Sequence, residues 1–129
     1  MSDLNDAIQG NVLEAQILSR KHLVLELDFS FGSIEELEAH IDTVDYAVPG
    51  GKSEENLVAL TRAWGCYLGE SLRRQVGGEW VRDDADKNQG IALRVDQQTL
   101  YPLEQVRKRL VDGEAFNVAT YFKQVRDRA

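Results

Sequence analysis

The chain has little cysteine and proline and no long apolar segment. Its one cysteine, Cys66, cannot form an internal disulfide, which agrees with a reducing compartment and leaves the fold to a hydrophobic core. Two prolines among 129 residues exclude a proline-rich linker or a collagen-like chain. No apolar run approaches the roughly 18 residues that a membrane-spanning helix needs, and the acidic start lacks the layout of a signal peptide. We therefore expect a cytoplasmic protein without a membrane partner.

Sequence motifs of catalysis and metal binding are missing as well. The chain has no glycine-rich nucleotide loop and no Gly-x-Ser-x-Gly nucleophile motif, and its two histidines belong to no His or Cys cluster. Residues 84–88 begin like a calcium loop, but Gln89 stands where that loop needs glycine and Val95 where it needs glutamate. A polar turn is the preferred interpretation. The sequence predicts no catalytic residue, no metal and no cofactor, and favours a protein that is not an enzyme.

Length and hydrophobic periodicity predict one α+β domain over residues 1–129. Hydrophobic residues make up 43% and charged residues 29%, the balance of an ordinary globular domain. Residues 23–29 alternate with the period of a strand, although a helix that continues to residue 27 is the alternative. The expected architecture is about five helices around a small antiparallel sheet of two to four strands. Helices are expected at 4–18, 34–44, 54–76, 102–112 and 115–126, and strands at 79–82, 90–95 and 99–101.

The longest predicted helix carries most of the expected core. Ser53 is its expected N-cap, and a Ser-x-x-Glu capping box predicts that the helix before it begins after Ser33. Gly65 and Gly69 lie four residues apart on one flank of the long helix. Because glycine costs about 1 kcal/mol relative to alanine inside a helix, we expect another backbone or a bulky ring to approach this flank closely.

The net charge of −7 is concentrated in the first half of the chain. Residues 1–60 hold twelve acidic and three basic residues, a balance of −9, whereas residues 61–129 hold ten acidic and twelve basic residues, a balance of +2. The acidic half should repel a phosphate backbone and attract a basic protein, so we expect no nucleic-acid partner and a basic protein partner. The basic triplet 107–109 fans out over its helix and is interpreted as a solvated face. The expected partner-binding residues are Glu35, Glu36, Glu38, Asp42 and Asp45.

Several short motifs follow one another along residues 25–125. They are Leu27-Asp28-Phe29-Ser30 with Ser33-Ile34-Glu35-Glu36-Leu37-Glu38, then Trp64-Gly65-Cys66-Tyr67-Leu68-Gly69-Glu70, then Gly77-Gly78-Glu79-Trp80, and last Pro102 to Val106. This order resembles a loose group of small bacterial domains of unknown function, with an Asp-aromatic-Ser turn, a Gly-x-x-x-Gly-Glu helix and a Trp-bearing hairpin. The resemblance implies a bacterial cytoplasmic origin and an α+β fold, and it implies no catalytic residue.

Three functions are compatible with these features. The favoured one is a non-enzymatic protein-binding module, with an immunity or inhibitor protein for a cytoplasmic toxin as its most concrete form. The alternative is a small-ligand-binding or enzymatic domain with a pocket between the long helix and the hairpin. A homodimer through the glycine flank is the third. An ordinary ion pair within the helix is the simpler interpretation of Glu70. The expected lining residues of the alternative pocket are Trp64, Glu70, Arg73 and Trp80.

Overall fold

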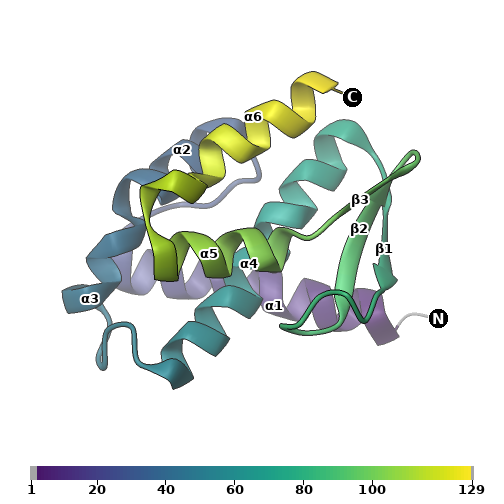
Figure 1. Ribbon diagram of the computed structural model, residues 1–129. Helices are drawn as coiled ribbons and strands as arrows, with labels where there is room; N and C mark the ends of the chain where they lie inside the picture. The colour runs from purple at the N-terminus through teal and green to yellow at the C-terminus, as the bar shows by residue number, and fades with distance from the viewer. Residues whose placement is uncertain (1–2, 129) are drawn as a thin grey trace.

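The computed structural model describes residues 3–128 and shows one α+β domain built around a central helix (Figure 1). Helix α4 (Glu54–Val76) runs through the middle, with α1 (Asp3–Leu23) packed on one side and α5 (Pro102–Asp112) on the other. Helices α2 (Phe31–His40) and α6 (Val118–Arg128) lie side by side above α5. The short elements are η1 (Ile41–Thr43), α3 (Val44–Ala47) and η2 (Glu114–Phe116).

A three-stranded antiparallel sheet lies at one end of the helices (Figure 1). Its strands are β1 (Glu79–Arg82), β2 (Ile91–Val95) and β3 (Gln98–Leu100), with β2 in the centre. Trp80 of β1 pairs with Leu93 of β2, which pairs on its other side with Leu100 of β3. Among the described residues five helices are longer than one turn. The predicted fold class, about five helices and a small antiparallel sheet, is therefore confirmed.

Helix α4 begins and ends as its sequence predicts. The Ser53 hydroxyl accepts a hydrogen bond from the backbone N–H of Asn56 at 3.2 Å, which satisfies one of the free donors of the first turn. The helix ends before Gly77, which has a φ of 87°. Every residue from Ala63 to Leu72 is buried. A helix that is buried all round needs neighbours on every side, and α1, α5, α6 and the sheet supply them.

The two glycines of α4 allow the close contacts that their spacing predicts. A Cβ atom added to Gly65 would lie 2.7 Å from the Cα atom of Leu103 in α5. A Cβ atom added to Gly69 would overlap the ring of Trp80 and lie 2.9 Å from Pro102. One glycine therefore admits a backbone and the other a ring, and the glycine flank is covered by this chain itself.

The turn between β1 and β2 is organised by a buried carboxylate. Asp86 accepts hydrogen bonds from the backbone N–H groups of Asn88, Gln89 and Ile91, at 3.2, 2.9 and 3.1 Å. The lone pairs that a calcium ion would need are thus taken by the turn itself. In residues 3–128 no group of three or more His, Cys, Asp or Glu side chains is placed to hold a metal ion.

The segment between α1 and α2 is neither a strand nor a helix. Helix α1 continues to Leu23, and Val24 then turns the chain with a φ of 56°, so that the N–H of Leu25 donates to the carbonyl of Ser19. Leu25 and Leu27 are buried without any strand partner, which explains the alternation in the sequence. The backbone N–H of Phe29 donates to the Tyr67 hydroxyl of α4 at 2.8 Å. The alternation of apolar and polar residues in this segment therefore reflects packing of Leu25 and Leu27 against helices and not pairing in a sheet.

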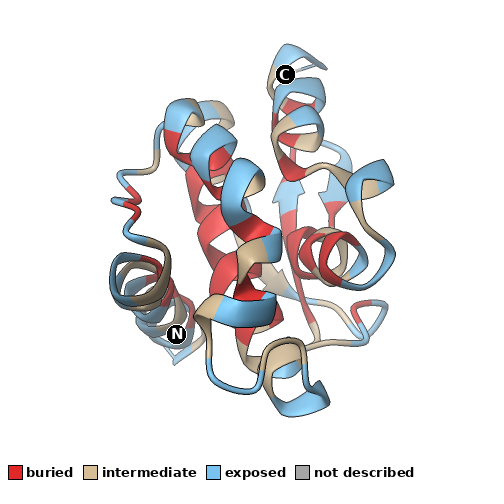
Figure 2. Ribbon diagram, turned by 90° about the vertical axis from the view of Figure 1, so that its left-hand side faces the viewer, coloured by how far each residue is buried: buried red, intermediate tan, exposed pale blue. Residues whose placement is uncertain are grey.

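The beginning of α2 differs from its prediction by one turn. Ser30 and not Ser33 is the N-cap, because the Ser30 hydroxyl accepts from the N–H of Ser33 at 3.1 Å. Ser33 is itself buried inside the helix. Figure 2 shows the resulting distribution, with buried residues along α4 and exposed residues on the outer turns. None of the helices within residues 3–128 is both long and apolar enough to cross a bilayer.

Candidate functional site

The surface of α2 and α3 holds three of the predicted partner-binding acids in exposed positions. Glu35 and Glu36 lie on the outer side of α2, and Asp45 and Tyr46 lie on α3, which follows directly after η1. Tyr46 is 82% exposed, the second most exposed of the large hydrophobic side chains described. Figure 2 looks onto this side of the molecule. We call Glu35, Glu36, Asp45 and Tyr46 the acidic face.

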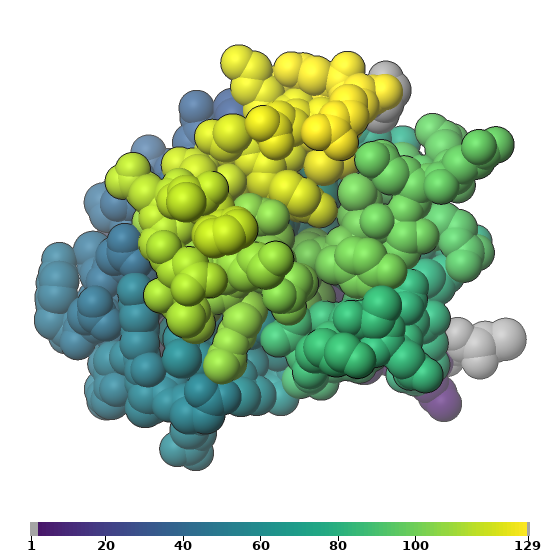
Figure 3. Space-filling model, in the orientation of Figure 1, coloured from purple at the N-terminus to yellow at the C-terminus, as the bar shows by residue number. Residues whose placement is uncertain are grey.

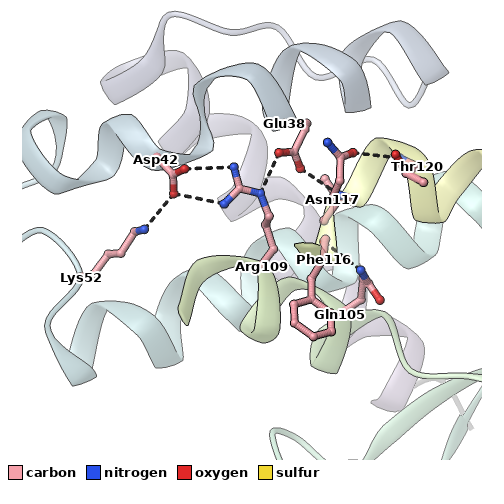
Figure 4. A network of polar contacts seen from close by, with 9 residues as sticks. Glu38, Asp42, Lys52, Gln105, Arg109, Phe116, Asn117 and Thr120 are labelled. Atoms are coloured by element: carbon pink, nitrogen blue, oxygen red, sulfur yellow. Dashed lines mark hydrogen bonds and ion pairs between the residues drawn. The ribbon is translucent and has the colours of Figure 1, made fainter. Parts of the chain in front are cut away.

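Two of the predicted partner-binding acids, Glu38 and Asp42, are paired with one buried arginine (Figure 4). Arg109 of α5 has only 3% of its side chain exposed. Its Nε donates to Glu38 Oε2 at 2.7 Å, and its two terminal nitrogens donate to the carboxylate of Asp42 at 3.2 and 3.0 Å. Lys52 donates to Asp42 at 2.8 Å from the other side. Glu38 and Asp42 therefore brace the helices instead of presenting free charge.

Glu38 also fixes the beginning of α6. Its second oxygen, Oε1, accepts from the backbone N–H of Val118 at 2.9 Å, where a helix N-terminus favours negative charge. The Asn117 side chain accepts from the N–H of Thr120 at 2.9 Å and caps the same turn. Gln105 of α5 donates to the carbonyl of Phe116 at 2.9 Å. The network thus joins α2, η1, α5 and the beginning of α6 (Figure 4).

The electrostatics of the network follow from this geometry. Partial burial raises the pKa of Asp42, but hydrogen bonds from Arg109 and Lys52 outweigh burial and hold that pKa below its usual value. Burial lowers the pKa of Arg109, and the bonds to Asp42 and Glu38 reverse that effect and raise it. Asp42 and Arg109 are therefore both charged at neutral pH. Each negative charge in the network is matched by a positive one at hydrogen-bond distance.

Sequence reasoning missed Arg109, which was expected on a solvated face. The signal was present in the spacing, because Arg109 lies three residues after Val106 and one before Leu110, both on the buried side of α5. The other members of the triplet do face outward, with Arg107 paired to Glu54 at 3.1 Å and Lys108 to Glu104 at 3.9 Å. A single basic residue on the apolar side of a helix predicts a buried ion pair.

The residues of the alternative pocket divide between core and surface. Trp64 is completely buried, and its Nε1 donates to Ser19 of α1 at 3.0 Å. Glu70, 1% exposed, accepts from Arg73 at 2.7 and 3.0 Å and from Trp80 Nε1 at 3.1 Å. Arg73 and Trp80 line a surface cavity of about 360 Å³ near the beginning of α1, and neither Trp64 nor Glu70 lines it. The structure brings three of the four residues together, as a structural cluster.

The surroundings of the one cysteine do not favour a role as a nucleophile. Cys66 is buried in the core, and burial raises the pKa of its thiol to about 12. At neutral pH the thiol is protonated, and it accepts a weak hydrogen bond from Asn11 of α1 at 3.7 Å. Cys66 is thus a small core residue.

Comparison with known proteins assigns the chain to a family. No curated protein and no solved structure matches it. Residues 43–122, more than half of the chain, match the family described as Domain of unknown function (DUF3806). The match contains α3, α4, the sheet and α5, whereas α1 and α2 lie before it. Through the helix and hairpin that build its centre, the chain belongs to the DUF3806 family.

Proposed function

We propose that this chain is a non-enzymatic binding module of the bacterial cytoplasm whose acidic face docks a basic protein partner. An immunity or inhibitor protein is the most concrete form of this function. One observation carries the proposal: Glu35, Glu36 and Asp45 are exposed, as is Tyr46, and none of these three carboxylates is bound by Arg109, which pairs with Glu38 and Asp42.

The chemistry of the acidic face suits a cationic protein surface. Three carboxylates attract lysine and arginine side chains and accelerate encounter at low salt. Among the described residues Glu35 and Asp45 take part in no ion pair, and Glu36 has only His40 at 3.8 Å. Tyr46 adds a large ring with a polar end, the residue type that most often anchors an interface. An arginine of the partner can stack on that ring and reach a carboxylate.

The buried network supports binding by holding this face in one shape. Arg109 ties α2 and η1 to α5, so α2 is fixed relative to the core, and so is η1, the segment that leads directly into α3. A surface that is already ordered loses little conformational entropy when a partner docks. The acids outside the network then provide recognition, and those inside it provide rigidity.

A capture experiment with charge-matched variants tests the proposal. The wild-type chain, the double variant Glu35→Lys with Glu36→Lys, and the control Asp6→Lys with Glu14→Lys are each immobilised and exposed to lysate of the native organism. Both variants carry the same change in net charge, and all four residues are exposed on helices. A bound basic protein is expected on the wild type and the control, and its recovery should fall at least tenfold on the Glu35/Glu36 variant.

Salt dependence provides the second readout. Raising ionic strength from about 50 to 500 mM should weaken capture, because the screening length falls to a few ångströms. Equal loss of the captured protein on the Glu35/Glu36 variant and on the α1 control would contradict a specific acidic face. Capture that ignores both the reversal and the salt would contradict it too.

A further inference from the structure

A second cavity lies where α4, α5 and the β1–β2 turn meet. It encloses about 380 Å³, within the range of roughly 300 to 1,000 Å³ typical of small-ligand sites. The first turns of α4, the middle of α5 and the tip of the turn form its walls, and these segments meet on the face shown in Figure 3. We call it the α4–α5 cleft. It lies within the family match at residues 43–122, whereas Glu35 and Glu36 lie outside that match.

A buried hydroxyl without a partner lines this cleft. Thr61 is 2% exposed, and its Oγ1 makes no hydrogen bond. Leaving a buried hydroxyl unpaired costs about 1 to 3 kcal/mol. In residues 3–128 the only other buried side-chain atom in this condition is the hydroxyl of Ser71, which does not line the cleft. The hydroxyl oxygen itself is closed off from solvent, so the Thr61 side chain would have to turn about its Cα–Cβ bond before a polar group of a ligand in the cleft could supply the missing bond.

Charges of both signs stand around the same cleft. Arg107 and Lys87 are basic, and Glu54 and Glu104 are acidic, so the lining has no net charge. One terminal nitrogen of Arg107 donates to both oxygens of Glu54, at 3.1 and 3.2 Å, and the other nitrogens of the guanidinium stay outside that pair. Glu104 Oε1 accepts from the side-chain nitrogen of Asn88 at 3.1 Å, and Glu104 Oε2 lies 3.9 Å from Nζ of Lys108, a loose and exposed ion pair within α5.

We propose that the α4–α5 cleft binds a small zwitterion of the α-amino acid class. The ligand carboxylate lies between Arg107 and Lys87, its ammonium faces Glu104, and a polar group reaches Thr61. A simple anion could pair with Arg107 and Lys87 but would gain nothing from Glu104, and a simple cation could pair with Glu104 but would gain nothing from the two basic residues. An apolar ligand would desolvate four charges for no new bond. This site is independent of the acidic face, and either can exist without the other.

The test is a titration of the whole protein with free amino acids, followed through its backbone amide NMR signals. Each of the twenty α-amino acids is added at millimolar concentration, together with amine and carboxylic acid analogues of any that bind. At least one amino acid should give saturable shifts in residues 54–61, 87–89 and 104–107. Both analogues should bind about tenfold more weakly or worse, because each leaves one charge of the cleft unpaired.

Two variants separate binding from folding. Thr61→Val keeps the shape of the side chain and removes the unpaired hydroxyl, so the variant should fold with equal or greater thermal stability while its affinity for the amino acid falls. Glu104→Gln should weaken the amino acid but not its carboxylic acid analogue. The exposed Glu114→Gln is the control and should change neither. Absence of saturable shifts with all twenty amino acids, analogues that bind as tightly, or shifts unaffected by both cleft variants would overturn the proposal.

Discussion

Single side chains in this protein show how burial and pairing decide the state of a charge. Glu70 is buried beside Trp80 and two arginines, Arg73 and Arg74. Burial alone raises its pKa, but the hydrogen bonds from Arg73 and Trp80 prevail and lower the pKa to about 2 from its usual 4.5. The carboxylate therefore stays charged in the core, because it accepts bonds from three side chains.

Glu70→Gln should change both stability and its pH dependence. Because the folded pKa lies below the unfolded value, Glu70 stabilises the fold above about pH 4.5, and this contribution disappears as the pH falls toward 2. At pH 7 the variant should lose roughly 3 kcal/mol of unfolding free energy, at 1.36 kcal/mol per pKa unit. Urea unfolding at pH 7, 4 and 3 measures the difference. A gap between wild type and variant that stays constant with pH would contradict this assignment.

The shape of Arg109 should matter as much as its charge. Arg109→Lys keeps the charge but cannot bond to Glu38 and Asp42 at the same time in the present geometry. We expect a loss of about 2 kcal/mol of unfolding free energy, measured by urea unfolding. The control is Arg107→Lys, whose partner Glu54 is largely exposed, and it should cost less than about 0.5 kcal/mol. Similar losses of unfolding free energy in both variants would show that the buried network stabilises the fold no more than the Arg107–Glu54 pair does.

At the scale of elements, the glycine flank decides how closely α5 and the sheet approach α4. Gly65→Ala places a methyl group 2.7 Å from the Leu103 backbone, which cannot move without shifting α5. We expect a loss of about 1 to 3 kcal/mol, although alanine is the better helix former. In the matched control, Gly10→Ala in α1, the methyl group meets nothing within 4 Å, and the variant should gain about 1 kcal/mol. Thermal unfolding of the two variants should therefore shift in opposite directions.

Elements that are specified by their own residues could be predicted from the sequence. The bounds of α4 and α5 were predicted correctly, because Ser53, Gly77 and Pro102 mark their ends locally. Residues 24–28 could not be predicted in the same way. Their alternation is real, but what buries Leu25 and Leu27 is helices distant in sequence, and period two cannot distinguish such packing from a sheet.

At the scale of the whole molecule, the candidate site also depends on contacts between residues distant in sequence, which local patterns do not show. Composition placed the excess of negative charge in the first half of the chain, and that much is readable without a structure. Glu38 and its partner Arg109 are 71 residues apart, so no local pattern shows that this acid is neutralised. The fold sorts the five predicted acids into two that pair with Arg109, the largely buried Glu38 and the exposed Asp42, and three exposed acids that stand outside this network.

The acidic face is tested most directly by locating the surface of the whole protein to which a cationic peptide binds. An octa-arginine peptide is titrated into the wild-type chain at low salt, and backbone amide shifts are followed by NMR. The largest shifts are predicted at residues 35–46, and Glu35→Lys with Glu36→Lys should remove them while Asp6→Lys with Glu14→Lys leaves them in place. Largest shifts on α1 or α6, or shifts at residues 35–46 that survive the Glu35/Glu36 reversal, would contradict the acidic face as the docking surface.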